Sequence, residues 1–185
     1  MKRRSRISEM AKAKTWAHHL AQRDDWLVID VETTGLGAHA EIVEVAVVSA
    51  RGHALVDVMV RPRMAPEPGA VRVHGLGAGT LRGASPFEEI YGTLADLLAG
   101  MTVVAYNAEF DRQALSNTCR IAGLPPVVCT WECAMTRYEQ WRGFHASLDT
   151  VCEVESIVID GTRHRALPDA TLVWRLIQRM AGRPA

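Results

Sequence analysis

The chain has 185 residues, of which 48% are hydrophobic and 23% are charged, and its 21 lysines and arginines balance its 21 aspartates and glutamates. This composition indicates a soluble globular protein of one ordinary domain, which can bury a core without help from disulfides or a membrane. Because the net charge is zero, it does not indicate whether the protein binds an anionic partner.

Basic side chains are concentrated in the first 25 residues, where seven lysines and arginines face only three acidic residues. Apolar residues between Ile7 and Ala21 follow a loose helical spacing. We therefore predict a basic N-terminal helical extension over residues 1–24 and a main domain over residues 25–182. The extension could grip phosphate groups, or it could be a solvated tail.

Features of a secreted or membrane-bound chain are not found. No apolar stretch of signal-peptide length follows the basic cluster, and no run approaches 18 apolar residues, so we expect no membrane partner. The cysteines show no CxxC spacing, which favours buried thiols and a cytoplasmic location. An interaction domain in which they bind zinc is an alternative. These cysteines are Cys119, Cys129, Cys133 and Cys152.

From Trp26 onward the chain changes to short segments rich in valine and isoleucine, which glycine-containing turns separate. The segments WLVIDVE, EIVEVAVVSA and ALVDVMV predict three consecutive strands. TVVAYN predicts a fourth strand, and VVCT at residues 127–130 predicts a short further one. Consecutive strands followed by alternating strands and helices favour an α/β fold with a mixed sheet.

Three amphipathic segments predict helices that pack on this sheet. The first, within ASPFEEIYGTLADLLAG, carries a capping box in which Ser85 is the N-cap, Pro86 takes the first helical position and Glu88 closes the box. The second, EFDRQALSNTCRIA, ends at Gly123. The third, ALPDATLVWRLIQRM, is the final helix, and Gly182 follows its end.

Four acidic residues and one histidine stand out by their positions. Side chains alternate along a strand, so Asp30 and Glu32 point the same way, about 7 Å apart. Burying two unpaired carboxylates among apolar neighbours costs free energy, which favours a functional role. The alternative is structural, because strand ends often carry exposed acids. Asp111 lies where a strand leads into a helix, which fits a ligand site or a simple helix-dipole acid. His164 and Asp169 lie where a loop meets the final helix, where a structural role is the alternative.

Taken together, the four carboxylates and the histidine form the set that phosphodiester hydrolysis with two hard cations requires. Magnesium prefers oxygen ligands. Two carboxylates about 5 Å apart repel by roughly 3 kcal/mol at an effective dielectric of 20, which bound cations would relieve. A histidine, with a reference pKa of about 6.5, can accept a proton at neutral pH.

The motifs IDVETTGL, NAEFD and HRALPDA occur in this order, with a supporting match at SLDTVC. They resemble the DEDDh branch of the DnaQ-like 3′–5′ exonucleases, which includes polymerase proofreading subunits, oligoribonuclease and ribonuclease T. The resemblance covers roughly Trp26 to Met180. It implies a ribonuclease-H-like α/β fold with a central five-stranded mixed sheet flanked by helices, so that residues 25–182 would be an exonuclease domain.

The resemblance also implies a mechanism. Two Mg²⁺ or Mn²⁺ ions would be held by Asp30, Glu32, Asp111 and Asp169, and Asp30 would bridge them. His164 would act as general base, and the 3′ end of single-stranded DNA or RNA would release a nucleoside 5′-monophosphate. The implied substrate contacts are Thr33, Thr34, Gly35, Leu36, His74 and Asn107. For His74 a plain surface turn, and for Asn107 a turn after a strand, are the alternatives.

The chain departs from the family pattern in two places. Tyr106 stands where relatives often have histidine, and CTWECAMTRYEQW lacks the usual Asp-Thr start. Both departures concern the substrate-binding rim, so the choice between DNA and RNA stays open, as do the oligomeric state and any polymerase or homodimer partner. A catalytically silent nucleic-acid-binding module with the same fold is the main alternative function.

Overall fold

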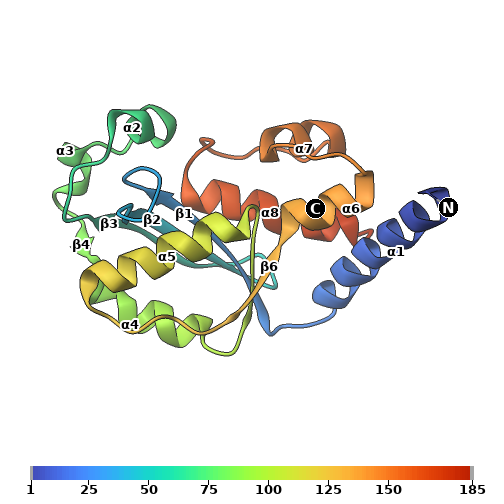
Figure 1. Ribbon diagram of the computed structural model, residues 1–185, viewed down its shortest axis with the longest axis horizontal. Coiled ribbons are helices and arrows are strands. Elements are labelled where there is room, and N and C mark those ends of the chain that lie inside the picture. The colour runs from blue at the N-terminus through green and yellow to red at the C-terminus, as the bar shows by residue number, and fades with distance from the viewer. Residues whose placement is uncertain (1, 184–185) are drawn as a thin grey trace.

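The computed structural model describes the backbone of residues 2–183 and the side chains of residues 6–183. A six-stranded sheet with the strand order β4-β3-β2-β1-β5-β6 forms its centre, and helices cover both faces (Figure 1). The predicted α/β fold with a mixed sheet is confirmed, with six strands where five were expected. The strands are β1 (Trp26–Thr33), β2 (Ile42–Ser49), β3 (Ala54–Arg61), β4 (Ser85–Pro86), β5 (Thr102–Ala105) and β6 (Thr130–Cys133).

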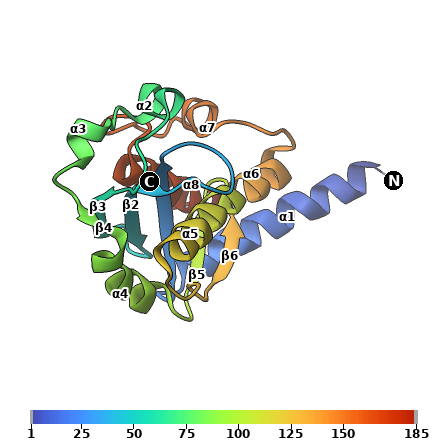
Figure 2. The ribbon, with the colours of Figure 1, turned by 60° about the vertical axis from the view of Figure 1, so that its left-hand side comes forward.

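The helices form two layers on the sheet (Figures 1 and 2). Helices α4 and α5 pack on one face, and α8 packs on the other with α1, α6 and α7 against it. Short helices α2 and α3 follow β3. The bounds are α1 (Lys2–Ala21), α2 (Pro68–His74), α3 (Ala78–Leu81), α4 (Phe87–Leu98), α5 (Ala108–Ala122), α6 (Ala134–Arg142), α7 (Leu148–Glu155) and α8 (Ala166–Met180).

The central strand β1 is almost entirely buried, and its side chains alternate between the two layers. Leu27, Ile29 and Val31 belong to the core beneath α4 and α5, whereas Trp26 and Val28 belong to the core beneath α8. The same alternation directs the side chains at positions 30 and 32 toward the α8 layer. The strand therefore carries apolar residues at its start and acids near its end on one face.

The pairing of β1 changes along its length. Strand β2 pairs with it antiparallel from Leu27 to Thr33, whereas the parallel strand β5 pairs only with Trp26–Val28. The chain then leaves the sheet after Ala105 and enters α5. This is the kind of strand end at which α/β folds place their ligand sites.

Two predictions about local structure are wrong. Ser85 is not an N-cap, because it lies in β4 and its backbone pairs with Val60 of β3. Helix α4 begins only at Phe87, after Pro86. No side-chain cap is formed there. The short strand expected at residues 127–130 instead begins at Thr130 as β6, where its pairing with β5 starts.

Helix α1 is found where the N-terminal helix was predicted, but it is docked on the sheet domain. Ala13, Ala17 and Leu20 form a buried stripe in the core that also holds Trp26 and Leu176. The stripe packs against α6 and α8. The charged residues of α1 from Arg6 onward thereby have a defined position on the surface.

The cysteines are free, two of them buried and two half-buried. Within residues 6–183 they do not gather into a group that could hold zinc. None of the helices in the described part of the chain has both the length and the hydropathy that a membrane crossing needs.

Candidate active site

Three acidic side chains meet at the end of β1. Asp30 and Glu32 come from β1, and Asp169 comes from the first turn of α8, so that one carboxylate oxygen of each lies within 4.8 Å of the others. Asp30 and Glu32 are half-buried, and Asp169 is buried. Carboxylate oxygens at this spacing are the donors that a hard divalent cation prefers.

Asp111 reaches the same place from the opposite layer. It lies in the first turn of α5 and is buried. Its Oδ1 accepts a hydrogen bond of 3.2 Å from the backbone N–H of Val31. Strand β5 pairs with β1 only as far as Val28. The Asp111 carboxylate therefore accepts the hydrogen bond that the backbone of a neighbouring strand would otherwise accept from Val31. The four predicted acids thus come together around the end of β1.

The crowding of these acids raises their pKa values. Burial, followed by the negative charges of Asp111 and Glu32, holds the pKa of Asp30 well above its ordinary value. Burial, with Glu44 and Asp111 nearby, raises the pKa of Glu32 to about 7. Burial also raises the pKa of Asp111 to about 7, against the hydrogen bond from Val31. A cation or a positively charged side chain next to these acids would therefore stabilise their ionised forms.

Within the protein, Arg163 supplies part of that charge. Its guanidinium forms ion pairs with Asp169 in the acidic centre and with Asp149 at the start of α7. The two atoms that meet in the inner pair, Arg163 Nη1 and Asp169 Oδ1, are both buried. A metal ion that bound Asp169 Oδ1 would take the place of this guanidinium.

His164 lies on the loop that leads into α8, beside Arg163, and its side chain is exposed. Its backbone φ of 57° is left-handed, a conformation that costs a non-glycine residue about 1–3 kcal/mol. Such a backbone persists only where the surrounding structure fixes it. The side chain lacks any hydrogen bond to the rest of the described chain, so it is available for another partner.

A buried ion pair fixes the loop directly after His164. Glu44 lies opposite Glu32 in the β1–β2 pair and is only 3% exposed. It accepts hydrogen bonds from Arg165 Nε at 3.0 Å and from the backbone N–H of Ala166 at 2.9 Å. Strand β2 thereby holds the N-terminus of α8, which carries Asp169.

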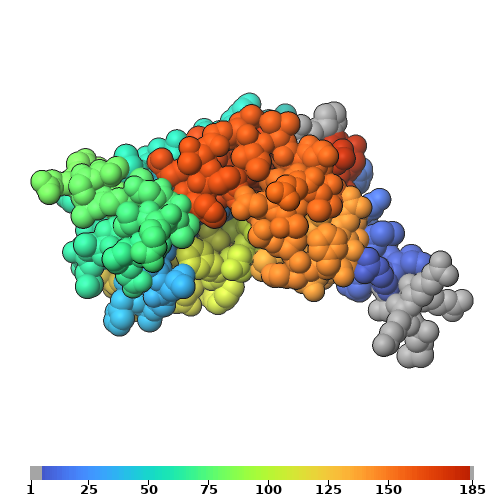
Figure 3. All heavy atoms as spheres, turned by 90° about the horizontal axis from the view of Figure 1, so that it is seen from above, coloured from blue at the N-terminus to red at the C-terminus, as the bar shows by residue number. Residues whose placement is uncertain are grey.

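Next to the acids lies a cavity of about 300 Å³. In Figure 3 the surface on this side is hollowed between the green atoms of α2, the orange-red atoms around α7 and the yellow-green atoms of α5. Four of the six predicted substrate contacts line the cavity, namely Thr33, Gly35, Leu36 and His74. Leu36 is among the most exposed apolar side chains in the described chain, at 81%.

The other two predicted contacts lie elsewhere. Thr34 is buried, and its hydroxyl accepts a hydrogen bond from the backbone N–H of Glu41. It closes the loop after β1. Asn107 is exposed at the start of α5, outside the residues that line the cavity.

His74 has a structural role in holding α2 against the end of β1. It is 6% exposed, its Nδ1 accepts a hydrogen bond from the backbone N–H of Leu76, and its Nε2 lies 3.1 Å from the carbonyl oxygen of Thr33. Nε2 must therefore carry the proton and donate it, which makes the ring neutral. Burial lowers the pKa of His74 in agreement with this state. His74 ties α2 to the end of β1, so the interpretation as a plain surface turn is wrong.

Phe110 and Glu67 also line the cavity and were not among the predicted contacts. Phe110 directly precedes Asp111 and could have been inferred from the NAEFD motif. Glu67 comes from the segment before α2. Its carboxylate lies next to Gly35 only in the folded chain, where a Cβ on Gly35 would be 2.5 Å from Glu67 Cδ. A side chain at position 35 would therefore force the Glu67 carboxylate to move.

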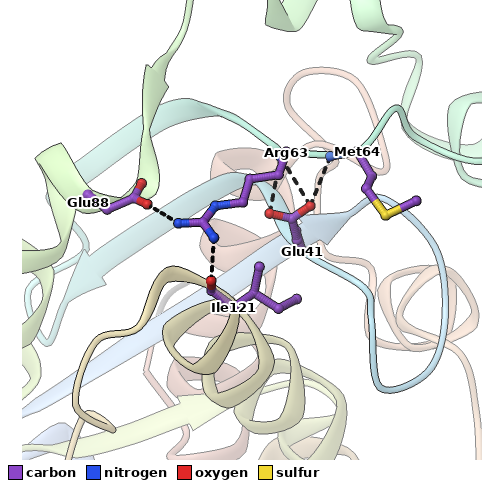
Figure 4. Close-up of polar contacts among 5 residues, drawn as sticks. All are labelled: Glu41, Arg63, Met64, Glu88 and Ile121. Atoms are coloured by element: carbon purple, nitrogen blue, oxygen red, sulfur yellow. Dashed lines mark hydrogen bonds and ion pairs between the residues drawn. The ribbon is translucent and has the colours of Figure 1, made fainter.

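Figure 4 shows the polar contacts that hold the segment leading into α2. The buried Glu41 carboxylate accepts hydrogen bonds of 3.1 Å from the backbone N–H groups of Arg63 and Met64. The Arg63 guanidinium pairs with Glu88 and donates to the carbonyl oxygen of Ile121. These contacts connect β3, α4 and α5 and so place one wall of the cavity.

The sequence pattern of the exonuclease family RNase T matches residues 27–177. The chain belongs to this exonuclease family. It is 30% identical to the "uncharacterized exonuclease CP81" of Escherichia phage 186, over 92% of each chain. The exonuclease is also 28% identical to the DNA polymerase III subunit epsilon of Pasteurella multocida, over 84% of this chain and 68% of that one. With the PolC-type DNA polymerase III of Bacillus cereus it shares 27% identity, over 89% of this chain but only 12% of the polymerase.

Solved structures support the fold. The exonuclease is similar to exonuclease X in complex with 5′ overhanging duplex DNA, with a TM-score of 0.67 and 25% identity over 85% of this chain and 93% of that one. The nuclease domain of 3′hExo, a DEDDh family member bound to rAMP, has a TM-score of 0.73 at 19% identity, over 86% and 93% of the two chains. The ribonuclease-H-like architecture implied by the sequence motifs is thereby confirmed.

Proposed function

We propose that the exonuclease removes nucleoside 5′-monophosphates from the 3′ end of single-stranded DNA or RNA with the help of two divalent cations, Mg²⁺ or Mn²⁺. The observation that carries this proposal is the meeting of Asp30, Glu32 and Asp169 within 4.8 Å, with Asp111 beside them. When bound, the cations would stabilise negative charge on the reacting phosphate and lower the pKa of the attacking water. The four acids would hold them.

His164 is the proposed general base. It lies on a loop that is fixed on both sides, by the ion pairs of Arg163 before it and by the Glu44–Arg165 pair after it. Its side chain is exposed, and it directly follows Arg163, whose guanidinium contacts Asp169 of the acidic centre. The water would lose its proton to the imidazole as the oxygen attacks the phosphorus in line with the leaving oxygen.

The 300 Å³ cavity is the proposed site of the terminal nucleoside. Leu36 and Phe110 offer apolar surface to a base, and the Gly35 backbone lets the nucleotide approach closely. Solved neighbours of this fold hold duplex DNA in one case and rAMP in another, as their titles state. Both DNA and RNA therefore belong in the substrate proposal.

We expect an oligonucleotide labelled at its 5′ end to shorten one nucleotide at a time in Mg²⁺, with nucleoside 5′-monophosphate as the product identified by chromatography. EDTA should abolish the reaction, and added Mn²⁺ should restore it. An oligonucleotide with a blocked 3′ end is the control. Degradation from the 5′ end, or turnover that persists in EDTA, would contradict the proposal. Tight binding in EDTA without any turnover in Mg²⁺ would favour the catalytically silent module.

Arg163→Gln should strengthen Mn²⁺ binding about three- to tenfold, because the guanidinium and the cation compete for Asp169. An opposite charge next to a carboxylate is worth on the order of 1 kcal/mol in such a setting. Titration calorimetry with Mn²⁺ measures the affinity directly. Arg175→Gln is the matched control, because Arg175 pairs with Asp160 outside the acidic centre. Equal affinity in the Arg163 variant and the wild type would show that Arg163 does not compete.

A further inference from the structure

A second charged feature lies at the other end of α8 from the acidic centre. Two cavities of about 360 and 480 Å³ adjoin there and share Trp141, Arg179 and Gly182 as lining residues. We call this surface the basic groove and define it by Lys14, His18, Trp141, Arg142, Arg179 and Arg183.

The basic groove is assembled from distant parts of the sequence. Lys14 and His18 are one helical turn apart on the exposed side of α1, next to the buried Ala13 and Ala17. Arg179 and Arg183 come from the end of α8 and the residues after it. The docking of α1 on α6 and α8 therefore adds its positive charge to that of the C-terminal segment (Figure 1).

Only part of the positive charge of the groove is neutralised within the described residues. Among the described residues that line the two cavities, no side chain is acidic. Glu155, which lies behind the groove, is buried with 1% of its side chain exposed and accepts two hydrogen bonds from Arg142. Its distance to Arg179 Nε is 3.9 Å, and 53% of the Arg179 side chain remains exposed.

The groove also holds one guanidinium in a fixed orientation. Arg142 lies 3.9 Å above the ring centroid of Trp141 and is bound from behind by Glu155. A planar guanidinium that is held in place by an aromatic ring and a carboxylate loses little freedom when it binds phosphate. The chemistry of the groove therefore fits a ligand with several phosphates.

We propose that the basic groove binds the phosphates of the nucleic-acid strand upstream of the bond that is cut, and so makes long substrates bind better than short ones. The proposal rests on the proposed function. The acidic centre repels a polyanion, and a positive surface on the same molecule offsets that repulsion. Asp169 and Arg179 are ten residues apart on α8, about 15 Å along the helix axis. A stacked strand covers that distance with about four to five nucleotides at 3.4 Å each.

The test uses the full chain with Lys14→Glu and Arg179→Glu combined. Binding of a labelled oligonucleotide of about 20 nucleotides is measured by fluorescence anisotropy in EDTA over a range of salt concentrations. We expect at least about tenfold weaker binding of the single-stranded oligonucleotide and a salt dependence reduced by roughly 0.7 for each phosphate contact that is lost. In Mg²⁺, KM should rise for the long substrate but not for a trinucleotide, and kcat should stay unchanged.

Arg82→Glu is the matched control, because Arg82 is an exposed arginine at the end of α3, outside the groove. An equal loss in the control, an equal loss on both substrate lengths, or unchanged binding of the long strand would each overturn the proposal. A polyglutamate peptide that competes as well as the oligonucleotide would do the same and would indicate an acidic protein partner. Because the anisotropy measurement needs no turnover, it decides the role of the groove even if the proposed reaction is not observed.

Discussion

Asp30→Asn is expected to lower kcat/KM at least about 10³-fold while it makes the metal-free protein more stable. Activity should fall because Asp30 is the proposed ligand shared by both cations, and such ligands support several kcal/mol of transition-state stabilisation. The measurement is the rate of mononucleotide release in Mg²⁺. Asp96→Asn is the matched control, because it makes the same chemical change at an exposed position of α4, outside the acidic centre. Activity close to that of the wild type in Asp30→Asn would contradict the proposed site.

The stability gain follows from the raised pKa of Asp30. The folded state raises the pKa of this acid above its value of about 4 in the unfolded chain. Between these two pKa values the unfolded chain ionises more readily than the folded one, so the free energy of unfolding falls as the pH rises. Asparagine cannot ionise. After the opposing attraction of Arg163 is subtracted, we expect a gain of about 1–3 kcal/mol at pH 8, or several degrees in Tm. The gain should be smaller at pH 5, and calorimetry in EDTA at both pH values tests this.

The sequence was sufficient where local rules decide the structure. The two-residue period of β1 placed Asp30 and Glu32 on one face, opposite Ile29 and Val31, and the structure has them so. The final helix also followed from its own apolar stripe. The meeting of these acids with Asp169 required the resemblance, because no local pattern says which helix packs over which strand.

Other features depend on contacts between distant residues. Ser85 has the composition of an N-cap, but pairing of its backbone with Val60 outweighs that local preference. The docking of α1 rests on two alanines, Ala13 and Ala17, whose small side chains give little hydrophobic pattern and yet allow close packing. Sequence alone therefore left open whether the N-terminal charges belong to a solvated tail.

The supports of the candidate site were hidden for the same reason. Glu44 and Arg165 are 121 residues apart, and their ion pair exists only because β2 lies beneath the start of α8. Thr34 and His74 are predicted substrate contacts, and their side chains also form hydrogen bonds within the protein. A motif identifies residues that matter to a site, but it does not distinguish contact with the ligand from support of the backbone.

His164→Ala and His164→Gly are both expected to lower kcat about 10²- to 10⁴-fold, because a general base contributes about that much. Affinity for Mn²⁺ and for an oligonucleotide should stay within about twofold of the wild type, since the histidine is not a proposed ligand. Stopped-assay kinetics and calorimetry measure these quantities. His145→Ala, which removes another exposed histidine, is the control.

The two variants also separate catalysis from folding. The backbone at position 164 is left-handed, so glycine relieves strain that alanine retains, and the glycine variant should be about 1 kcal/mol more stable than the alanine variant. If His164 were only a structural residue, the more stable glycine variant would recover activity. If it is the base, both variants should be equally inactive, and added imidazole should restore part of the turnover in the glycine variant, where the missing ring leaves space.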